Sequence, residues 1–106
     1  MEKIIEIMDD ISTNIEEAHE KIEKAFRMKE KCPYYAEWEA GMAATHLSFN
    51  TKGIETMDRM LDNWHRDSAH EGMHEEAGFK DFCTMWKGHI MKRTAKVRSM
   101  IEAFSK

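Results

Sequence analysis

Residues that interrupt helices and strands are scarce in this chain. Its 106 residues include one proline and five glycines, so little divides the sequence into short elements. No run approaches the roughly 20 apolar residues that span a bilayer. The first residues also lack the pattern of a signal peptide. We therefore expect a cytoplasmic protein without a membrane segment, built from a few long elements.

Several classes of site are also missing. The two cysteines, Cys32 and Cys83, form no metal-type pair such as C-x-x-C. A formal net charge of -4 argues against a general nucleic-acid binder. The chain has neither a G-x-S-x-G elbow nor a phosphate-cradling glycine loop, so an ordinary hydrolase or transferase is disfavoured.

The composition is that of one folded domain, residues 1–106, with 42% hydrophobic and 34% charged residues. In its first third, apolar residues recur at alternating steps of four and three, which predicts a helix with a heptad stripe. Acidic residues crowd the start of this helix and basic residues its end, as the helix dipole favours. Pro33 is expected to stop it. The stripe consists of Ile4, Met8, Ile11, Ile15, Ala18, Ile22 and Phe26.

A second helix is expected from about Tyr34 to about Arg66. Its stripe keeps phase across Gly53, which favours one continuous helix, and a break at Asn50–Gly53, giving four helices, is the alternative. Residues 40–51 carry no formal charge, so this helix should be covered on more than one side, by its own neighbours or by a second copy. The expected stripe is Tyr35, Trp38, Met42, His46, Phe49, Gly53, Met57, Met60 and Trp64.

Residues 67–78 read as a loop, although Ser68–Glu71 has the form of a capping box. A third helix is expected from about Ala77 to the end of the chain. The sequence thus predicts an all-α, up-down-up antiparallel bundle of three long helices. The residues expected to point inward from the third helix are Phe82, Trp86, Ile90, Val97, Ile101 and Phe104.

A tight turn at Cys32-Pro33 would place His19 of the first helix opposite His46 of the second. Imidazoles and carboxylates bind iron, manganese or zinc, and helical bundles hold such sites between facing helices. Glu16 and His19 have the Glu-x-x-His spacing, and Glu20 or Glu39 can add a ligand. The alternative is that the acidic residues of the first helix pair with basic residues of the third, such as Lys87 and Lys96.

A second candidate metal cluster lies between the second and third helices. His70 and His74 are four residues apart and Glu71 precedes His74 by three. The two cysteines are expected to lie on the order of 40 Å apart, with Cys83 level with Leu61, so no intramolecular disulfide is expected.

The runs Ile5–Ile11 and Glu16–Lys21, the Pro33 start of the second helix and the Gly88–Lys92 and Lys96–Arg98 runs resemble small ferritin-like bundle proteins of bacteria and their prophages. This resemblance implies a helical bundle, and in di-iron members Glu on two helices and Glu-x-x-His on two others. Here Glu16 and His19 have that form. The second helix has His46 where a bridging Glu would be expected.

Two functions follow as hypotheses. The first is a small iron-, manganese- or zinc-binding bundle with a His/Glu site between the first two helices. The second is a non-enzymatic protein–protein interaction or inhibitor module. A phage origin, which the resemblance above suggests, is compatible with it. The module would act through a helix face or a dimer seam. Its partner would be a second copy or another protein bound through the second helix, with Tyr34 and Trp38 as exposed candidates.

Overall fold

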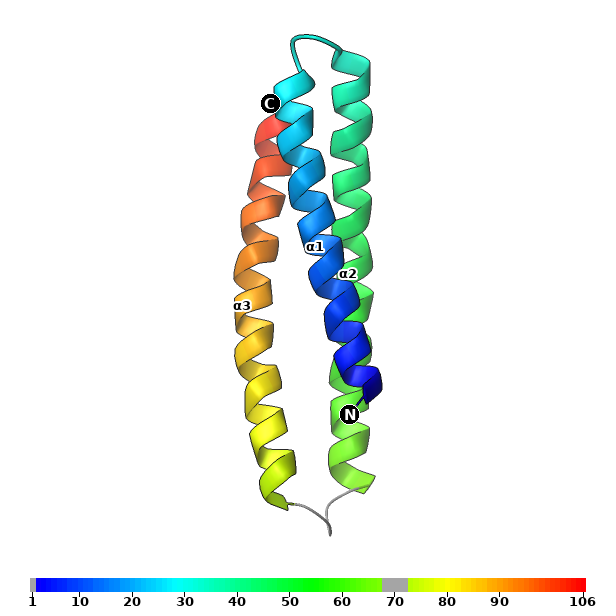
Figure 1. Cartoon of the computed structure of the whole chain (residues 1–106), viewed down its shortest axis with the longest axis vertical. Helices are drawn as coiled ribbons and strands as arrows, with labels where there is room; N and C mark the ends of the chain where they lie inside the picture. The colour runs from blue at the N-terminus through cyan, green and yellow to red at the C-terminus, as the bar shows by residue number, and fades with distance from the viewer. Residues whose placement is uncertain (1, 68–72) are drawn as a thin grey trace.

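The computed structural model describes residues 2–67 and 73–106, and the side chains of 2–63 and 78–106. It contains three helices: α1 (Glu2–Met28), α2 (Pro33–Asp67) and α3 (Met73–Ser105) (Figure 1). The prediction of an all-α chain is confirmed. No helix of the described part is long and apolar enough to cross a membrane.

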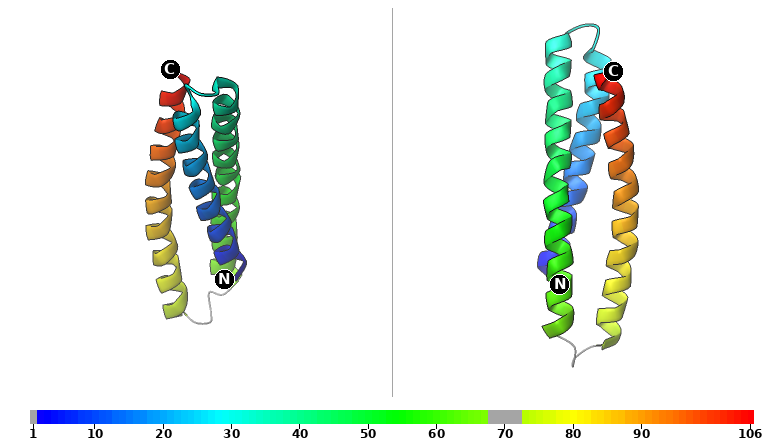
Figure 2. Two further views of the ribbon diagram at one scale, coloured as in Figure 1. Left: turned by 45° about the horizontal axis from the view of Figure 1, so that its top comes forward. Right: turned by 180° about the vertical axis from the view of Figure 1, so that it is seen from behind.

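The molecule is a thin rod. Its extents are 60 × 17 × 17 Å, and its radius of gyration of 17.1 Å exceeds the about 13 Å of a compact domain of this length. α2 returns along α1, and α3 then runs beside both (Figures 1 and 2). Because the rod is only three helices thick, every helix has a long face on the outside.

The turn between α1 and α2 occupies Lys29–Cys32. The Cys32 amide donates to the Met28 carbonyl at 2.8 Å, and the Ala36 amide donates to the Cys32 carbonyl at 3.0 Å. Pro33 is the first residue of α2, where its fixed φ suits the helix and its missing N–H leaves no bond unmade.

The inward stripe of α1 is confirmed from Ile4 to Ile22, every member of which is buried. Its last predicted member, Phe26, is wrong: its side chain is 40% exposed, and Ala25 is buried in its place. Phe26 instead packs edge to face on Phe104 of α3, with ring centroids 5.5 Å apart. Phe104 therefore belongs to the core at this end of the rod, and the exposed ring of Phe26 covers it.

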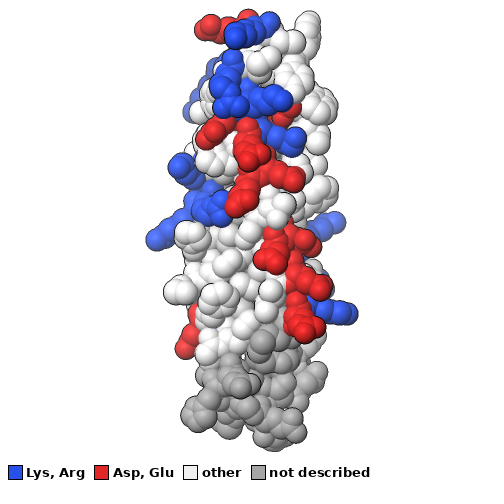
Figure 3. Space-filling view, in the orientation of Figure 1, with Lys and Arg blue, Asp and Glu red and all other residues white. Residues whose placement is uncertain are grey.

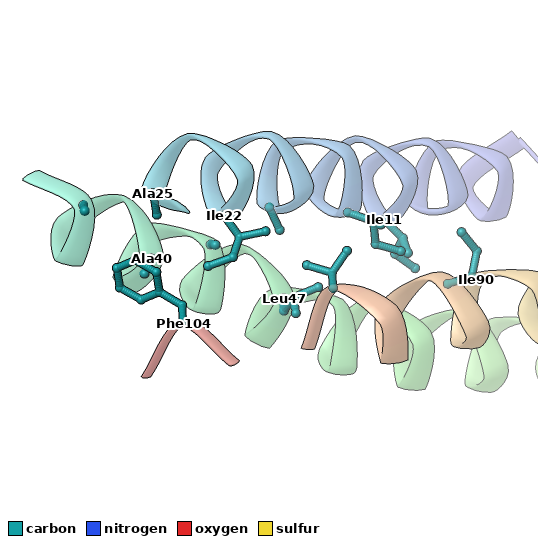
Figure 4. Packing of buried hydrophobic residues seen from close by; sticks show 12 residues of the cluster. Ile11, Ile22, Ala25, Ala40, Leu47, Ile90 and Phe104 are labelled. Atoms are coloured by element: carbon teal, nitrogen blue, oxygen red, sulfur yellow. The ribbon is translucent and has the colours of Figure 1, made fainter. Parts of the chain in front are cut away.

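The predicted stripe of α2 is wrong at Trp38 and Phe49, whereas Met57 is fully buried as predicted and the side chain of Trp64 lies outside the described residues. Trp38 and Phe49 are 56% and 58% exposed, and the buried positions are mostly small: Ala36, Ala40, Ala43 and Leu47. Figure 4 shows Ile22 and Ile11 of α1 pointing toward α2, with Leu47 of α2 between their levels and Ala40 beyond Ile22, near Ala25. Helices that meet through alanines approach closely, and that spacing leaves no room for indole or phenyl rings.

α2 is continuous through Gly53, as predicted. A Cβ atom at Gly53 would lie 3.0 Å from Cγ1 of Ile11, which is itself buried. Nearby, the Asn50 side-chain amide donates to the Ile11 carbonyl at 3.2 Å. The glycine thus permits the close approach of α1, and the amide fixes the register of the two helices.

α3 begins at Met73, four positions before the predicted start, so part of the expected loop is helical. Ile90, Val97 and Phe104 are buried as predicted, whereas Phe82 is 47% exposed. α3 packs less extensively on either neighbour than α1 packs on α2. The predicted capping box, Ser68–Glu71, lies outside the described residues.

We expect Gly53→Ala to lack the usual gain in helix stability. Alanine in a helix interior is favoured over glycine by about 0.5–1 kcal/mol. At Gly53 the new methyl group meets buried Ile11, whereas Gly88 has nothing within 4 Å of its Cβ position. Urea unfolding should therefore show a gain for Gly88→Ala and none, or a loss, for Gly53→Ala. Equal gains at both positions would refute the close contact.

Candidate functional site: the outer face of α2 and the α2–α3 furrow

The predicted metal ligands lie at the α1–α2 seam. The turn ends α1 at Met28 rather than at Cys32, so the predicted register is displaced by about four residues, one helical turn. His46 lies beside two residues of α1: its Nδ1 is 3.3 Å from Asn14 Oδ1, and its Nε2 is 3.4 Å from Glu17 Oε2. Glu17 was not among the predicted ligands.

His19 makes a different pair. Its Nε2 lies 2.9 Å from Glu23 Oε1, one turn further along α1. The contacts therefore place the two histidines in separate imidazole–carboxylate pairs. The predicted ligands Glu16 and Glu20 have exposed side chains on α1.

Glu39 is buried in the α1–α2 seam, only 3% exposed. Its carboxylate oxygens lie 3.8 Å from the ammonium groups of Lys21 and Lys24. Lys24 also lies over the Tyr35 ring, 5.1 Å from its centroid. A hydrogen bond to Tyr35 raises the pKa of Lys24, and the Glu39 carboxylate adds to this shift. Glu39 thus anchors two lysines of α1 to α2.

Within residues whose side chains are described, no three His, Cys, Asp or Glu side chains gather closely enough to hold a metal ion. The second predicted cluster falls outside this part of the chain: His70 and Glu71 are not described, and of His74 only its place in α3 is given.

The alternative prediction paired the carboxylates of α1 with basic residues of α3. At Lys87 the partner lies on α2 instead. The Lys87 ammonium group lies 2.7 Å from Asp58 of α2. On the side seen in Figure 3, acidic side chains follow α1 and basic ones gather at the upper end and along upper α3. These two sets lie side by side on the surface.

The outer face of α2 is apolar and exposed. We define it by Tyr34, Trp38, Thr45 and Phe49, which share one side of the helix by their spacing. Tyr34 is 86% exposed, and Trp38, which stacks on Tyr35 with ring centroids 5.9 Å apart, is 56% exposed. The Thr45 hydroxyl donates to the Gly41 carbonyl at 3.0 Å, so its hydrogen is used within the helix. Between the aromatic rings the face therefore offers neutral surface.

Hollows lined by residues of α2 and α3 lie along the seam of these two helices; the right-hand view of Figure 2 shows α2 and α3 side by side, with α1 behind them. The largest hollow, about 570 Å³, lies between Ala40 and Gly41 of α2 and Ile101 and Phe104 of α3. Two smaller hollows that share lining residues with it or with each other continue past Thr51, and a separate hollow of about 330 Å³ lies further along the same two helices, beside Asp58. We call this surface the α2–α3 furrow.

Several polar side chains lie close together near the middle of the furrow. Asn50, Thr51, Thr94 and Arg98 line a hollow of about 150 Å³ there. Neither Asn50 Oδ1 nor the Thr94 hydroxyl, both buried, is hydrogen-bonded to another described group. Arg98 lies level with Leu47, with which it lines an adjoining hollow.

Comparison with protein-family models, with curated proteins and with solved structures found no match. The interaction hypothesis had named Tyr34 and Trp38 as exposed candidates, but the predicted inward stripe of α2 included Trp38 as well as Phe49, and the sequence gave no sign of the furrow. The exposed position of Phe49 could have been inferred from helical spacing, because residues 34, 38, 45 and 49 lie on the same side of a helix. The furrow depends on the position of α3 and has no local signal.

The two cysteines differ in environment. Cys32 is exposed in the turn and Cys83 is buried, level with Leu61 as predicted. Burial raises the pKa of the Cys83 thiol above its ordinary value of 9.0. The folded protein therefore holds Cys83 as a neutral, unreactive thiol.

We expect maleimide at pH 8 to modify Cys32 rapidly and Cys83 only after unfolding. The raised pKa of Cys83 also makes stability pH-dependent: above about pH 9 the unfolded chain loses this proton first, so the free energy of unfolding falls as pH rises. Mass spectrometry of labelled peptides checks the first point, and urea unfolding of wild type against Cys83→Ala the second. Rapid labelling of Cys83 in folded protein would contradict its burial.

Proposed function

We propose that this chain is a non-enzymatic protein-interaction module that binds an apolar helix of a partner through the outer face of α2. The observation that carries the proposal is the exposure of Tyr34, Trp38 and Phe49 on one side of a single helix. Aromatic side chains in such positions dominate the binding energy of many interfaces, because they bury much area with few rotatable bonds.

The shape and charge of this face support a helical partner. From Tyr34 to Phe49 it is a straight ridge, about 22 Å long at the rise of an α-helix. Residues 40–51 carry no formal charge, so a partner needs no ionic groups to match this stretch. Such a ridge fits against one apolar helix face in the manner of helices packing within bundles. A protein that inhibits its partner by covering a surface would work in this way.

A photo-crosslinking amino acid at position 38 or 49 tests the proposal in extracts of the cells that produce the protein. Both positions should give the same discrete crosslinked product. Position 85 is the matched control, because Met85 is also apolar and 68% exposed but lies on α3. Trp38→Ala should reduce the yield of the product from position 49 at least about tenfold.

The side chains tested are exposed, so these substitutions should change the free energy of unfolding by no more than about 0.5 kcal/mol. A lost product can then be assigned to lost binding rather than to unfolding. Equal crosslinking from positions 38 and 85 would contradict a binding face on α2.

Metal binding between α1 and α2 is the second candidate function. It is supported by two imidazole–carboxylate pairs, His46–Glu17 and His19–Glu23, whose carboxylates lie on neighbouring turns of α1. These are ligand types that zinc, iron and manganese accept in bundles of the ferritin-like style.

Titration with Zn²⁺, Fe²⁺ and Mn²⁺, followed by calorimetry and elemental analysis, tests this candidate. A site at the seam predicts near-stoichiometric metal and at least about tenfold weaker binding in both His19→Ala and His46→Ala, with the helical content unchanged. His89→Ala, on α3, is the control. Protein that binds none of the three ions would exclude the candidate and leave these residues as ion pairs.

A further inference from the structure

The two rims of the α2–α3 furrow carry opposite charges. Among the described residues that line it, the acidic ones come from α2: Glu37, Asp58 and Asp62. The basic ones from α3 and the residue after it are Lys80, Lys87, Arg98 and Lys106. Lys29 of the α1–α2 turn also borders the largest hollow and donates to the Phe104 carbonyl at 3.2 Å, and Asp58 and Lys87 pair with each other. Acidic side chains on α2 therefore lie across from basic ones of α3 and Lys106 at the two ends of the furrow.

Apart from Arg98, the charges that line the furrow lie toward its two ends, and the α2 side between them is neutral. Glu37 and Lys106 border the largest hollow, whereas Asp62 and Lys80 border the hollow at the other end. All four side chains are exposed. Between these ends, Ala44, Ser48 and Thr51 line the α2 side, so another helix can approach closely there.

We propose that a second copy of this chain docks on the furrow, with the two-fold axis parallel to the helices. A dimer of identical chains needs a self-complementary surface. Rotation about an axis along the rod places α2 of one copy over α3 of the other and keeps every residue at its own height. The acidic rim of each copy then meets the basic rim of its partner.

The pairing is specific at both ends. Glu37 and Lys106 lie at one height and Asp62 and Lys80 at another, so each carboxylate faces an ammonium group across the interface. An axis perpendicular to the rod would instead stack α2 on α2 and place acidic residues over acidic ones. Charge thus selects the parallel axis, because like charges across an interface oppose docking.

The available area is sufficient for a stable dimer. The outline of one face, 60 × 17 Å, is at most about 1,000 Å² for each copy, so the ~800 Å² that each partner buries in a standard interface requires contact along most of the rod. The chain exposes 7414 Å², whereas a folded monomer of its mass exposes about 6,200 Å². Docking through the furrow would cover much of this excess.

Sedimentation of the untagged chain gives the first test. We expect a dimer of twice the 12.5 kDa chain mass. The dissociation constant of this dimer should rise with added salt. A chain that remains monomeric up to millimolar concentration would overturn the proposal.

Exchange of the charges gives the second test. The first variant, Glu37→Lys with Asp62→Lys, has two basic rims, and the second, Lys80→Glu with Lys106→Glu, has two acidic rims. Each variant alone should dimerise at least about tenfold more weakly than wild type, and an equal mixture should restore a heterodimer. General damage to the fold would not be repaired by mixing. Dimers unaffected by either change, or no heterodimer on mixing, would overturn the proposal.

A thiol crosslinker distinguishes the two axes. In a chain carrying Cys32→Ser and Cys83→Ala, we expect a short bismaleimide to join a copy with Ser48→Cys to a copy with Arg98→Cys. Two copies with Ser48→Cys should not be joined, and their crosslinking would overturn the parallel axis. These outcomes leave the outer face of α2 untouched, so they do not decide the proposed function.

Discussion

The close approach of α1 and α2 is the constraint on which the rest of this structure depends. Alanines on both helices form much of the seam, among them Ala18 and Ala25 of α1 and Ala36 and Ala43 of α2, all completely buried. Gly53 lies against Ile11 and lets the backbones stay close where a Cβ atom would intrude. Small side chains hold two long helices together over a long distance, because each removes apolar area from water without pushing the partner away.

This close packing explains the two surfaces that carry the functional proposals. The isoleucines of α1 pack mainly on alanines of α2, which leaves no place for large rings on this side of α2, and Trp38 and Phe49 lie on its outer face. α3 packs less closely on both neighbours, and hollows remain along the α2–α3 seam. Both surfaces are therefore consequences of one tight helix pair with a third helix packed on it.

Polar groups at the seam set its register rather than supply most of its stability. The Asn50 amide bonds to the Ile11 carbonyl, and His46 lies between Asn14 and Glu17. A buried amide or imidazole is costly to leave unpaired, so a slip of one turn between the helices would be opposed at each of these points. Glu39, with its two lysines, adds an ionic contact at the other end of the same seam.

Much of the fold was predictable, because it depends on local patterns. The stripe from Ile4 to Ile22, the end of the first helix before Pro33 and the continuity of α2 all follow from spacing, backbone chemistry and the absence of stronger breaks. The level of Cys83 also follows, since equal rise per residue relates antiparallel helices once a turn is located. The inward side of α2 was not predictable from hydrophobicity, because alanine and aromatic residues both satisfy an apolar pattern.

The sequence by itself determined three long helices, the inward face of α1 and a neutral stretch on α2. Only the tertiary structure decided which side of α2 is buried, which residues His19 and His46 meet, and where a furrow remains. The physical reason is distance. Helix formation depends on neighbours within a few residues, whereas these outcomes depend on the four-residue turn and on how closely alanines allow two helices to approach.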